Sequence, residues 1–224
     1  MGHHAIAREL INKEITPQEE RAYMTWAAAR PPDEIAAMQA YGAAVKPLFR
    51  SLQDLREKTV EPTSSEVQAL IVDWNTIAGR CGLRNFMATL LEWNPVVARK
   101  WIEVGERAMS RSMTPEQPAL ADGGLWAYFG AAQEASPWHR ALTQTSDEAT
   151  KLAEDKVSPS SASATELANR LRRICSDYSL GDPLIYARWA GAMQFRKSSA
   201  ENARSKAGWT YLAEALSVPT ANGT

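Results

Sequence analysis

The spacing of apolar residues along the chain follows the period of an α-helix. Between Thr63 and Gly82 these side chains recur three or four residues apart: Val67, Leu70, Ile71, Trp74 and Ile77. Residues at this spacing share one helix face, and no stretch of comparable length alternates with the two-residue period of a strand. The pattern predicts an all-α protein of roughly a dozen helices joined by short connections.

Helix starts are marked by a capping residue followed by proline, which suits the first turn because it lacks the amide hydrogen left unpaired there. Such pairs occur at Thr16-Pro17, Asn94-Pro95, Thr114-Pro115, Ser136-Pro137 and Asp182-Pro183. The spacing of a capping box is found for Thr16 with Glu19, Thr63 with Glu66, and Thr114 with Gln117. The serine-rich stretch 157–163 precedes another periodic segment, so we expect a loop and a helix cap there rather than a domain linker.

Two parts of the chain have a similar order of residues. The segment Pro62–Leu83 aligns without gaps with Pro159–Leu180, at an offset of 97 residues, and the alignment pairs Leu70 with Leu167. Loops vary in length between such copies while helices keep their buried faces. We therefore predict two related helical halves, 20–112 and 113–216, with a leader or helix at 1–19 and a flexible tail at 217–224.

Charge and composition narrow the classes of function. Lys and Arg number 25 against 26 Asp and Glu, so the net charge of −1 gives no electrostatic footprint for nucleic acid or for an anionic membrane. No apolar run approaches the ~18 residues of a membrane span, and only two cysteines are present, Cys81 and Cys175. We expect a cytoplasmic protein with no nucleic-acid partner and no membrane partner.

Tryptophan is the unusual component: 8 Trp outnumber 6 Tyr and 4 Phe. Core packing explains any single tryptophan, but eight are more than a helical core of this size needs. Several lie in each predicted half: Trp74, Trp93 and Trp101 in the first, and Trp126, Trp138, Trp189 and Trp209 in the second. A seam between two packed halves is where a cavity can stay open, so the surplus suggests a cleft lined by indoles.

Motifs for catalysis are missing from the sequence. There is no glycine-rich phosphate loop, no nucleophile elbow and no zinc-protease helix. His139 is the only histidine beyond the first four residues, so a metal site would need a cluster of Asp, Glu or Cys that the spacing does not provide. A structural histidine and inert buried thiols are the simpler interpretation. We expect no catalytic residue, no metal and no cofactor.

The stretch Ser64–Trp74, the loop at Gly82-Leu83 and the helix after Asn94-Pro95 together resemble the TipAS antibiotic-recognition domain. The second half resembles it more loosely, through Leu167, Leu171, Ile174, Ser179–Pro183, Tyr186 and Trp189. The resemblance implies two globin-like TipAS subdomains with a ligand cleft or tunnel between them. Two such halves without a DNA-reading domain are similar to the albicidin-resistance proteins, which take up a long aromatic peptide antibiotic in a tunnel between subdomains.

The resemblance and the tryptophan surplus predict a resistance protein that sequesters a large aromatic peptide antibiotic, albicidin-like rather than a thiopeptide, without turnover. The residues expected to line the site are Trp74, Trp93, Trp101, Tyr178, Trp189 and Met193, with Asn75 and Arg80 as polar contacts. In thiopeptide-binding relatives a cysteine adds covalently to the drug, but no match to that position is evident, so noncovalent binding is expected. The alternatives are the ligand-sensing effector domain of a MerR-type transcription regulator, and an enzyme that uses His139 or a cysteine on the drug.

Overall fold

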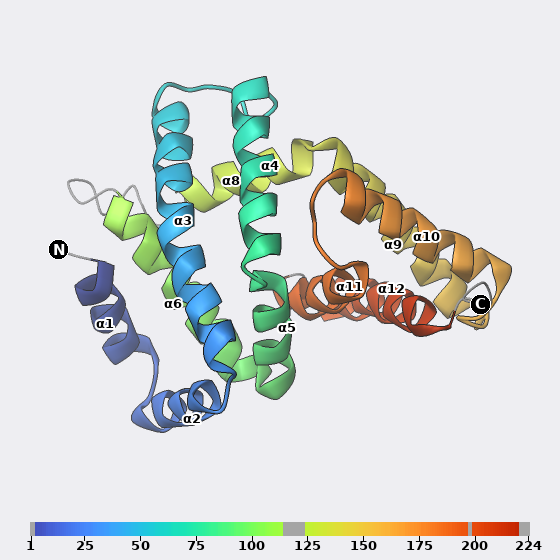
Figure 1. Ribbon diagram of the computed structural model, residues 1–224, viewed down its shortest axis with the longest axis horizontal. Coiled ribbons are helices and arrows are strands. Elements are labelled where there is room, and N and C mark those ends of the chain that lie inside the picture. The colour runs from blue at the N-terminus through green and yellow to red at the C-terminus, as the bar shows by residue number, and fades with distance from the viewer. Residues whose placement is uncertain (1–2, 114–123, 197–198, 220–224) are drawn as a thin grey trace. The chain divides into compact units, whose positions relative to one another are not determined.

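The computed structural model describes residues 3–113, 124–196 and 199–219 (Figure 1). These residues form eleven α-helices and one 3-10 helix, with no strand among them, which confirms the all-α prediction. The elements are α1 (His3–Glu14), α2 (Pro17–Ala28), α3 (Pro32–Glu57), α4 (Ser65–Arg80), α5 (Leu83–Trp93), α6 (Pro95–Met113), α8 (Gly124–Ala135), α9 (Pro137–Glu154), α10 (Ala162–Asp177), α11 (Pro183–Ala192), η1 (Met193–Arg196) and α12 (Ser199–Ser217). None of the described helices combines the length and the apolar character that a membrane span requires.

Helices begin where the pairs of capping residue and proline predict them. The pairs at 16–17, 94–95, 136–137 and 182–183 directly precede or open α2, α6, α9 and α11. Thr16 and Glu19 form the predicted capping box, and the carboxylate of Asp182 accepts hydrogen bonds from the first amides of α11. The pairs predicted at Thr114, with Pro115 and with Gln117, lie outside the described residues.

The capping box predicted for Thr63 with Glu66 is wrong by one residue. Helix α4 begins at Ser65, and the hydroxyl that accepts a hydrogen bond from the Val67 amide, at 3.3 Å, belongs to Ser64. The sequence offers three consecutive hydroxyl residues at this helix start, Thr63, Ser64 and Ser65, and the chain uses the second as the cap. The cap expected in the serine-rich stretch is Ser161, which accepts from the Ala164 amide of α10 at 3.2 Å.

The chain divides into two compact units. The first unit comprises Met1–Ile77 and Thr89–Ser136, and the second unit comprises Ala78–Ala88 and Pro137–Thr224. These bounds differ from those of the predicted halves, because contacts assign α8 to the first unit and the segment 78–88 to the second. The common origin of the halves, 20–112 and 113–216, and a cleft between them, stay predictions.

The core of the first unit is aromatic where α3, α4 and α8 meet. Phe49 of α3 is fully buried, and its ring lies 5.2 Å from that of Phe129 of α8. Trp74 of α4 meets Phe129 edge-on at 5.1 Å, and its indole N–H donates to the Tyr41 hydroxyl at 3.0 Å. Because its donor is used inside the core, Trp74 is held in one orientation.

In the second unit, α12 lies unusually close to α9. A Cβ atom at Gly208 of α12 would come within 2.2 Å of the Thr150 hydroxyl oxygen and 2.7 Å of the Ser146 carbonyl oxygen. Only glycine permits this approach. The apolar stripe of α10, with Leu167 and Leu171, is buried in the same unit.

Two turns have the same backbone structure. The first turn, residues 58–64, joins α3 to α4, and the second turn, residues 155–161, joins α9 to α10; each reverses the chain (Figure 1). Thr59 and Lys156 occupy equivalent positions with φ of 55° and 54°. The amides of Val60 and Val157 each donate to a carbonyl five residues earlier, at 3.0 Å in the first turn and 2.9 Å in the second. This is the Schellman motif, in which a left-handed residue ends a helix.

Candidate functional site

Four aromatic rings from three helices of the first unit form a continuous series, which we call the aromatic ladder. Its members are Tyr23 and Trp26 of α2, Trp93 of α5 and Trp101 of α6. The rings of Trp101 and Tyr23 are stacked with centroids 4.0 Å apart, and those of Trp26 and Trp93 are stacked at 5.6 Å. Tyr23 and Trp26 connect the two pairs at 5.9 Å. The separations of 5.6 and 5.9 Å are typical of favourable aromatic pairs, and the Tyr23–Trp101 pair is closer still.

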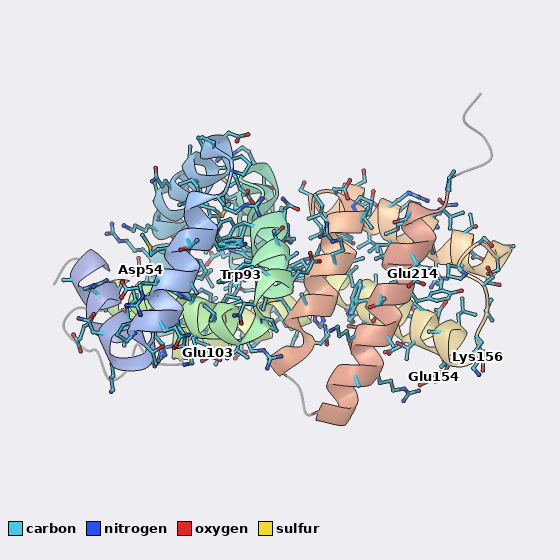
Figure 2. The ribbon with its side chains drawn as sticks, turned by 90° about the horizontal axis from the view of Figure 1, so that it is seen from below. Asp54, Trp93, Glu103, Glu154, Lys156 and Glu214 are labelled. Carbon is cyan, nitrogen blue, oxygen red and sulfur yellow. The ribbon has the colours of Figure 1, made fainter. Side chains whose placement is uncertain are left out.

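The two ends of the ladder differ in exposure. At one end of the ladder, Trp101 packs against the apolar cluster formed by α1 and α6, which includes Leu10 and Val104. Trp93, labelled in Figure 2, is 38% exposed, and Val96, three residues further on, is 62% exposed. An exposed indole stacked on the buried Trp26 leaves a flat apolar surface open to a ligand.

Polar groups accompany the ladder. The Arg30 guanidinium carbon lies 5.3 Å from the centroid of the Trp26 ring, a cation–π distance, and its Nε donates to Glu34 Oε2 at 3.0 Å. Within the described residues, Glu34 Oε1 and Trp101 Nε1 are buried without a hydrogen-bond partner. A buried acceptor or donor left unpaired costs about 1–3 kcal/mol, so a ligand that pairs with it gains affinity.

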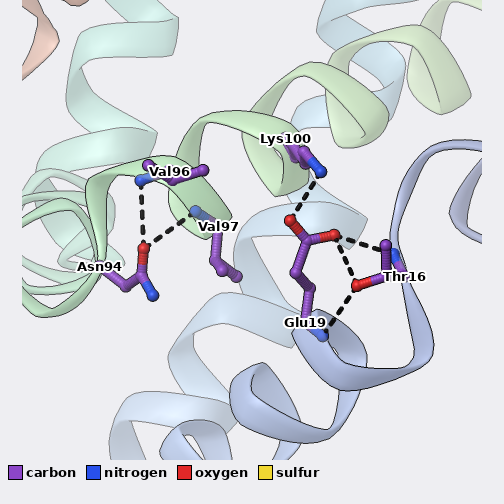
Figure 3. Close-up of polar contacts among 6 residues, drawn as sticks. All are labelled: Thr16, Glu19, Asn94, Val96, Val97 and Lys100. Atoms are coloured by element: carbon purple, nitrogen blue, oxygen red, sulfur yellow. Dashed lines mark hydrogen bonds and ion pairs between the residues drawn. The ribbon is translucent and has the colours of Figure 1, made fainter.

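One ion pair holds the helix that carries Tyr23 against the helix that carries Trp101. Glu19 accepts from the Thr16 amide at 2.8 Å as part of the capping box, and its other oxygen accepts from Lys100 at 2.6 Å (Figure 3). The hydrogen bond from Lys100, followed by that from Thr16, lowers the pKa of the Glu19 carboxyl. A single carboxylate therefore both starts α2 and fixes it to α6.

The second unit contains a separate aromatic group around a buried arginine. The Arg84 guanidinium carbon lies 5.3 Å from the ring centroids of both Tyr186 and Trp189, and Nη1 donates to the Leu180 carbonyl at 2.8 Å. Tyr186 and Trp189 meet at 5.3 Å and 70°, and burial raises the pKa of the Tyr186 hydroxyl. Arg84 thus holds together two rings of α11 and one carbonyl of the connection between α10 and α11.

Burial also governs the thiol of Cys175, one of the two buried cysteines of this unit. Cys175 is 1% exposed, and burial raises its pKa to about 12, against a smaller opposing effect of the Arg84 guanidinium. At neutral pH the thiol is protonated and is a poor nucleophile.

The predicted site residues fall in both units. The first unit holds Trp74, Asn75, Trp93 and Trp101, and the second holds Arg80, Tyr178, Trp189 and Met193. In the first unit, Trp93 and Trp101 belong to the ladder, whereas Trp74 and Asn75 are buried in the α4 region of the core. In the second unit, Trp189 contacts Arg84, Arg80 is exposed, and Tyr178 and Met193 are half-buried. That these eight residues line one cavity stays a prediction.

Three residues of the ladder region, Tyr23, Trp26 and Arg30, are not among the predicted site residues. Tyr23 and Trp26 lie three residues apart on one face of α2, and Arg30 lies two residues beyond the end of that helix. The helix itself was predicted from its capping box. The spacing of Tyr23 and Trp26 on this capped helix is the sequence signal for their part of the ladder.

Among the described residues, no three His, Cys, Asp or Glu side chains gather as a metal site would require. No protein-family model matches the chain, and neither a curated protein nor a solved structure is found to be similar to it. The interpretation of the aromatic ladder therefore rests on its geometry.

Proposed function

We propose that the protein binds a large aromatic peptide antibiotic of the albicidin type and sequesters it noncovalently, as a cytoplasmic resistance protein without enzymatic turnover. The observation that carries the proposal is the aromatic ladder, in which Trp93 is 38% exposed and stacks at 5.6 Å on the buried Trp26. A planar group of the ligand placed on Trp93 extends this series. Each aromatic pair contributes roughly 0.5–1.5 kcal/mol beyond the burial of apolar area.

The polar groups beside the ladder fit an amide-linked ligand. Glu34 Oε1 is a buried acceptor that a ligand amide N–H can occupy, and Arg30, held over Trp26 by Glu34, can donate to a ligand carbonyl. A peptide antibiotic carries both kinds of group at regular intervals. The combination of flat rings with one acceptor and one cation favours such a ligand over a purely apolar one.

The state of the cysteines supports noncovalent binding. Cys175 has a pKa of about 12 because it is buried, and Cys81 is 6% exposed. Both lie in the second unit, whereas the ladder lies in the first. Attack on a bound drug needs an accessible thiolate, so the proposal involves stacking and hydrogen bonds only.

Tryptophan fluorescence titrated with albicidin tests the proposal. We expect quenching, and we expect Trp93→Ala to weaken binding at least about tenfold, because a stacked aromatic anchor at the centre of a site is worth ~1.4 kcal/mol or more. Val72→Ala removes another exposed apolar side chain of the first unit and serves as the matched control, with unchanged affinity. An absence of quenching, or equal affinity of Trp93→Ala, contradicts the proposal.

Two further measurements define the mode of binding. The mass of the ligand after incubation stays unchanged if the protein only sequesters it, whereas a changed mass indicates enzymatic turnover. The predicted tunnel adds a contact from Trp189, so Trp189→Ala is the variant that tests it. Loss of affinity in both Trp93→Ala and Trp189→Ala supports the tunnel, and loss in Trp93→Ala alone limits the site to the ladder.

A further inference from the structure

The second unit has a groove of about 620 Å³ between the second turn and α12. This volume lies within the range of ~300–1,000 Å³ that is typical of small-molecule sites. Three alanines, Ala153, Ala203 and Ala207, contribute to its lining and leave room for a ligand. All of its lining residues belong to the second unit, so the groove is separate from the aromatic ladder.

The walls of the groove are fixed by two contacts. Gly208 brings α12 against α9, since a Cβ at this position would meet the Thr150 side chain and the Ser146 carbonyl. The hydroxyl of Tyr211, which lines the groove, donates to the carbonyl of Ser158 in the second turn at 3.2 Å. The opening is therefore a defined feature of the packing of α12.

Two carbonyl groups that accept hydrogen bonds in the first turn have counterparts beside the groove that accept none from the part of the chain that the structure describes. In the first turn, the carbonyl of Val60 accepts from Tyr128 at 2.7 Å and that of Pro62 accepts from the Gln68 amide at 2.8 Å. The equivalent residues, Val157 and Pro159, line the groove, and their carbonyls accept no hydrogen bond from any described residue. They are available to a donor on a ligand.

The charge on the groove is positive. Its lining contains the ammonium groups of Lys156 and Lys206 and one carboxylate, Glu214; Lys156 and Glu214 are labelled in Figure 2. Within the described part of the chain, neither lysine forms an ion pair, whereas the neighbouring Glu154 is paired with Arg204 at 2.8 Å. Two cations beside one anion attract a negatively charged group.

We propose that this groove is a binding site for a small organic carboxylate with an apolar body. The apolar body lies on Ala203 and Ala207, and the carboxylate is attracted by Lys156 and Lys206. A ligand that also carries a hydroxyl or an amide N–H can donate it to the carbonyl of Pro159, which lines the groove. Phosphate lacks the apolar body, and a neutral alcohol lacks the charge, so both bind more weakly.

Cyclohexanecarboxylate is the probe, because it is not aromatic and does not stack on the ladder. Amide NMR shifts on titration are expected to change within 153–159 and 203–214 and to stay unchanged for Tyr23 and Trp101. Cyclohexylmethanol, the neutral match, and inorganic phosphate are expected to bind more weakly. Binding is also expected to weaken as salt is raised from about 0.05 to about 0.5 M. Equal binding of the alcohol or of phosphate overturns the proposal.

Variants of the two lysines complete the test. Lys206→Gln, at an exposed position of α12, is expected to weaken binding about fivefold, the effect of ~1 kcal/mol for one exposed charge. Lys156→Gly removes the other ammonium and relieves its left-handed backbone, so the fold is retained. Thr59→Gly makes the same backbone change in the first turn and leaves binding unchanged.

An affinity that is unaffected in both lysine variants overturns the assignment. Trp93→Ala is expected to bind cyclohexanecarboxylate normally, since Trp93 lies in the first unit. A failure of albicidin to bind would therefore contradict the proposed function only, and a failure of cyclohexanecarboxylate to bind would contradict the groove proposal only.

Discussion

The turn that joins α3 to α4 and the turn that joins α9 to α10 follow the same backbone path but have different neighbours. Thr59 and Lys156 both have positive φ, and each turn ends in a serine that caps the next helix: Ser64 bonds Val67 at 3.3 Å, and Ser161 bonds the equivalent amide at 3.2 Å. These interactions are local, so similar short sequences produce them in both units.

Residues distant in the sequence determine which groups lie next to each turn. The Gln68 amide donates to the carbonyls of Pro62 and Ala132 at 2.8 and 2.9 Å, and the Ser136 hydroxyl donates to Gln68 at 2.6 Å, so α8 is bonded to the first turn. The residue equivalent to Gln68 is Thr165, whose hydroxyl only bonds Ser161 of its own turn. One turn is covered by a helix, and the other borders a groove. The backbone of a turn and the groups that cover it therefore vary independently.

The largest expected effect concerns the helix that bounds the groove. Gly208→Ala places a Cβ against backbone and side-chain atoms of α9, so α12 must move, and we expect a loss of about 2–3 kcal/mol in the free energy of unfolding. Gly130→Ala, on α8 with no atom within 4 Å of the new Cβ, is the control and is expected to stabilise by about 0.5–1 kcal/mol. Urea unfolding measures both, and a neutral Gly208→Ala contradicts the close approach.

The next prediction tests directly whether hydrogen bonds to α8 stabilise the first turn more than local bonds stabilise the second turn. Gln68→Ala removes three hydrogen bonds around the first turn, and we expect a loss of about 2 kcal/mol in stability. Thr165→Ala, its match in the second turn, removes one exposed local bond and is expected to cost only a few tenths of a kcal/mol. Thermal unfolding distinguishes the two, and equal losses would show that the turns are covered alike.

A smaller effect tests the similarity of the backbones. Thr59→Gly and Lys156→Gly each remove a side chain from a left-handed residue, and we expect each to stabilise the protein by about 1 kcal/mol. Thr59→Gly should gain slightly more, because a β-branched residue is less suited to positive φ. A gain in one turn and a loss in the other, measured by chemical unfolding, would show that the two backbones differ in solution.

The smallest effect is an acid dependence shared by the units. Hydrogen bonds from Lys100 and Arg170 lower the pKa values of Glu19 in the first unit and Glu148 in the second. A lowered pKa in the folded state means that the stabilisation is present above about pH 4.5, the ordinary value, and is lost as the pH falls through the folded pKa. In an NMR titration, Lys100→Ala should raise the pKa of Glu19 and leave that of Glu148 unchanged.

Local features of the fold were predictable from the sequence. Val67, Ile71 and Trp74 of the predicted stripe are buried on α4. The capping box of Thr16 starts α2. Both features depend on residues within a turn or two of each other. The choice of Ser64 over Thr63 was not predictable, since either hydroxyl suits the position. The assignment of α8 to the first unit depends on contacts such as Phe129 with Phe49, which no local pattern reveals.

The candidate site was predictable only in part. The tryptophan surplus selected Trp93 and Trp101, and both belong to the aromatic ladder. Tyr23 and Trp26 reach them because α2 is fixed to α6 by an ion pair between residues 81 positions apart, Glu19 and Lys100. Periodicity describes one helix at a time, so it cannot pair the faces of two helices that are distant in sequence.

The two buried thiols give the molecule an internal reporter of local opening. Cys81 and Cys175 are 6% and 1% exposed, and both belong to the second unit. A thiol reagent can reach them only when the structure around them opens, so the rate of labelling measures the opening free energy of that unit alone. Tryptophan fluorescence of a variant with Trp138, Trp189 and Trp209 replaced by phenylalanine reports the first unit over the same denaturant range. The two signals together measure how cooperatively the units unfold.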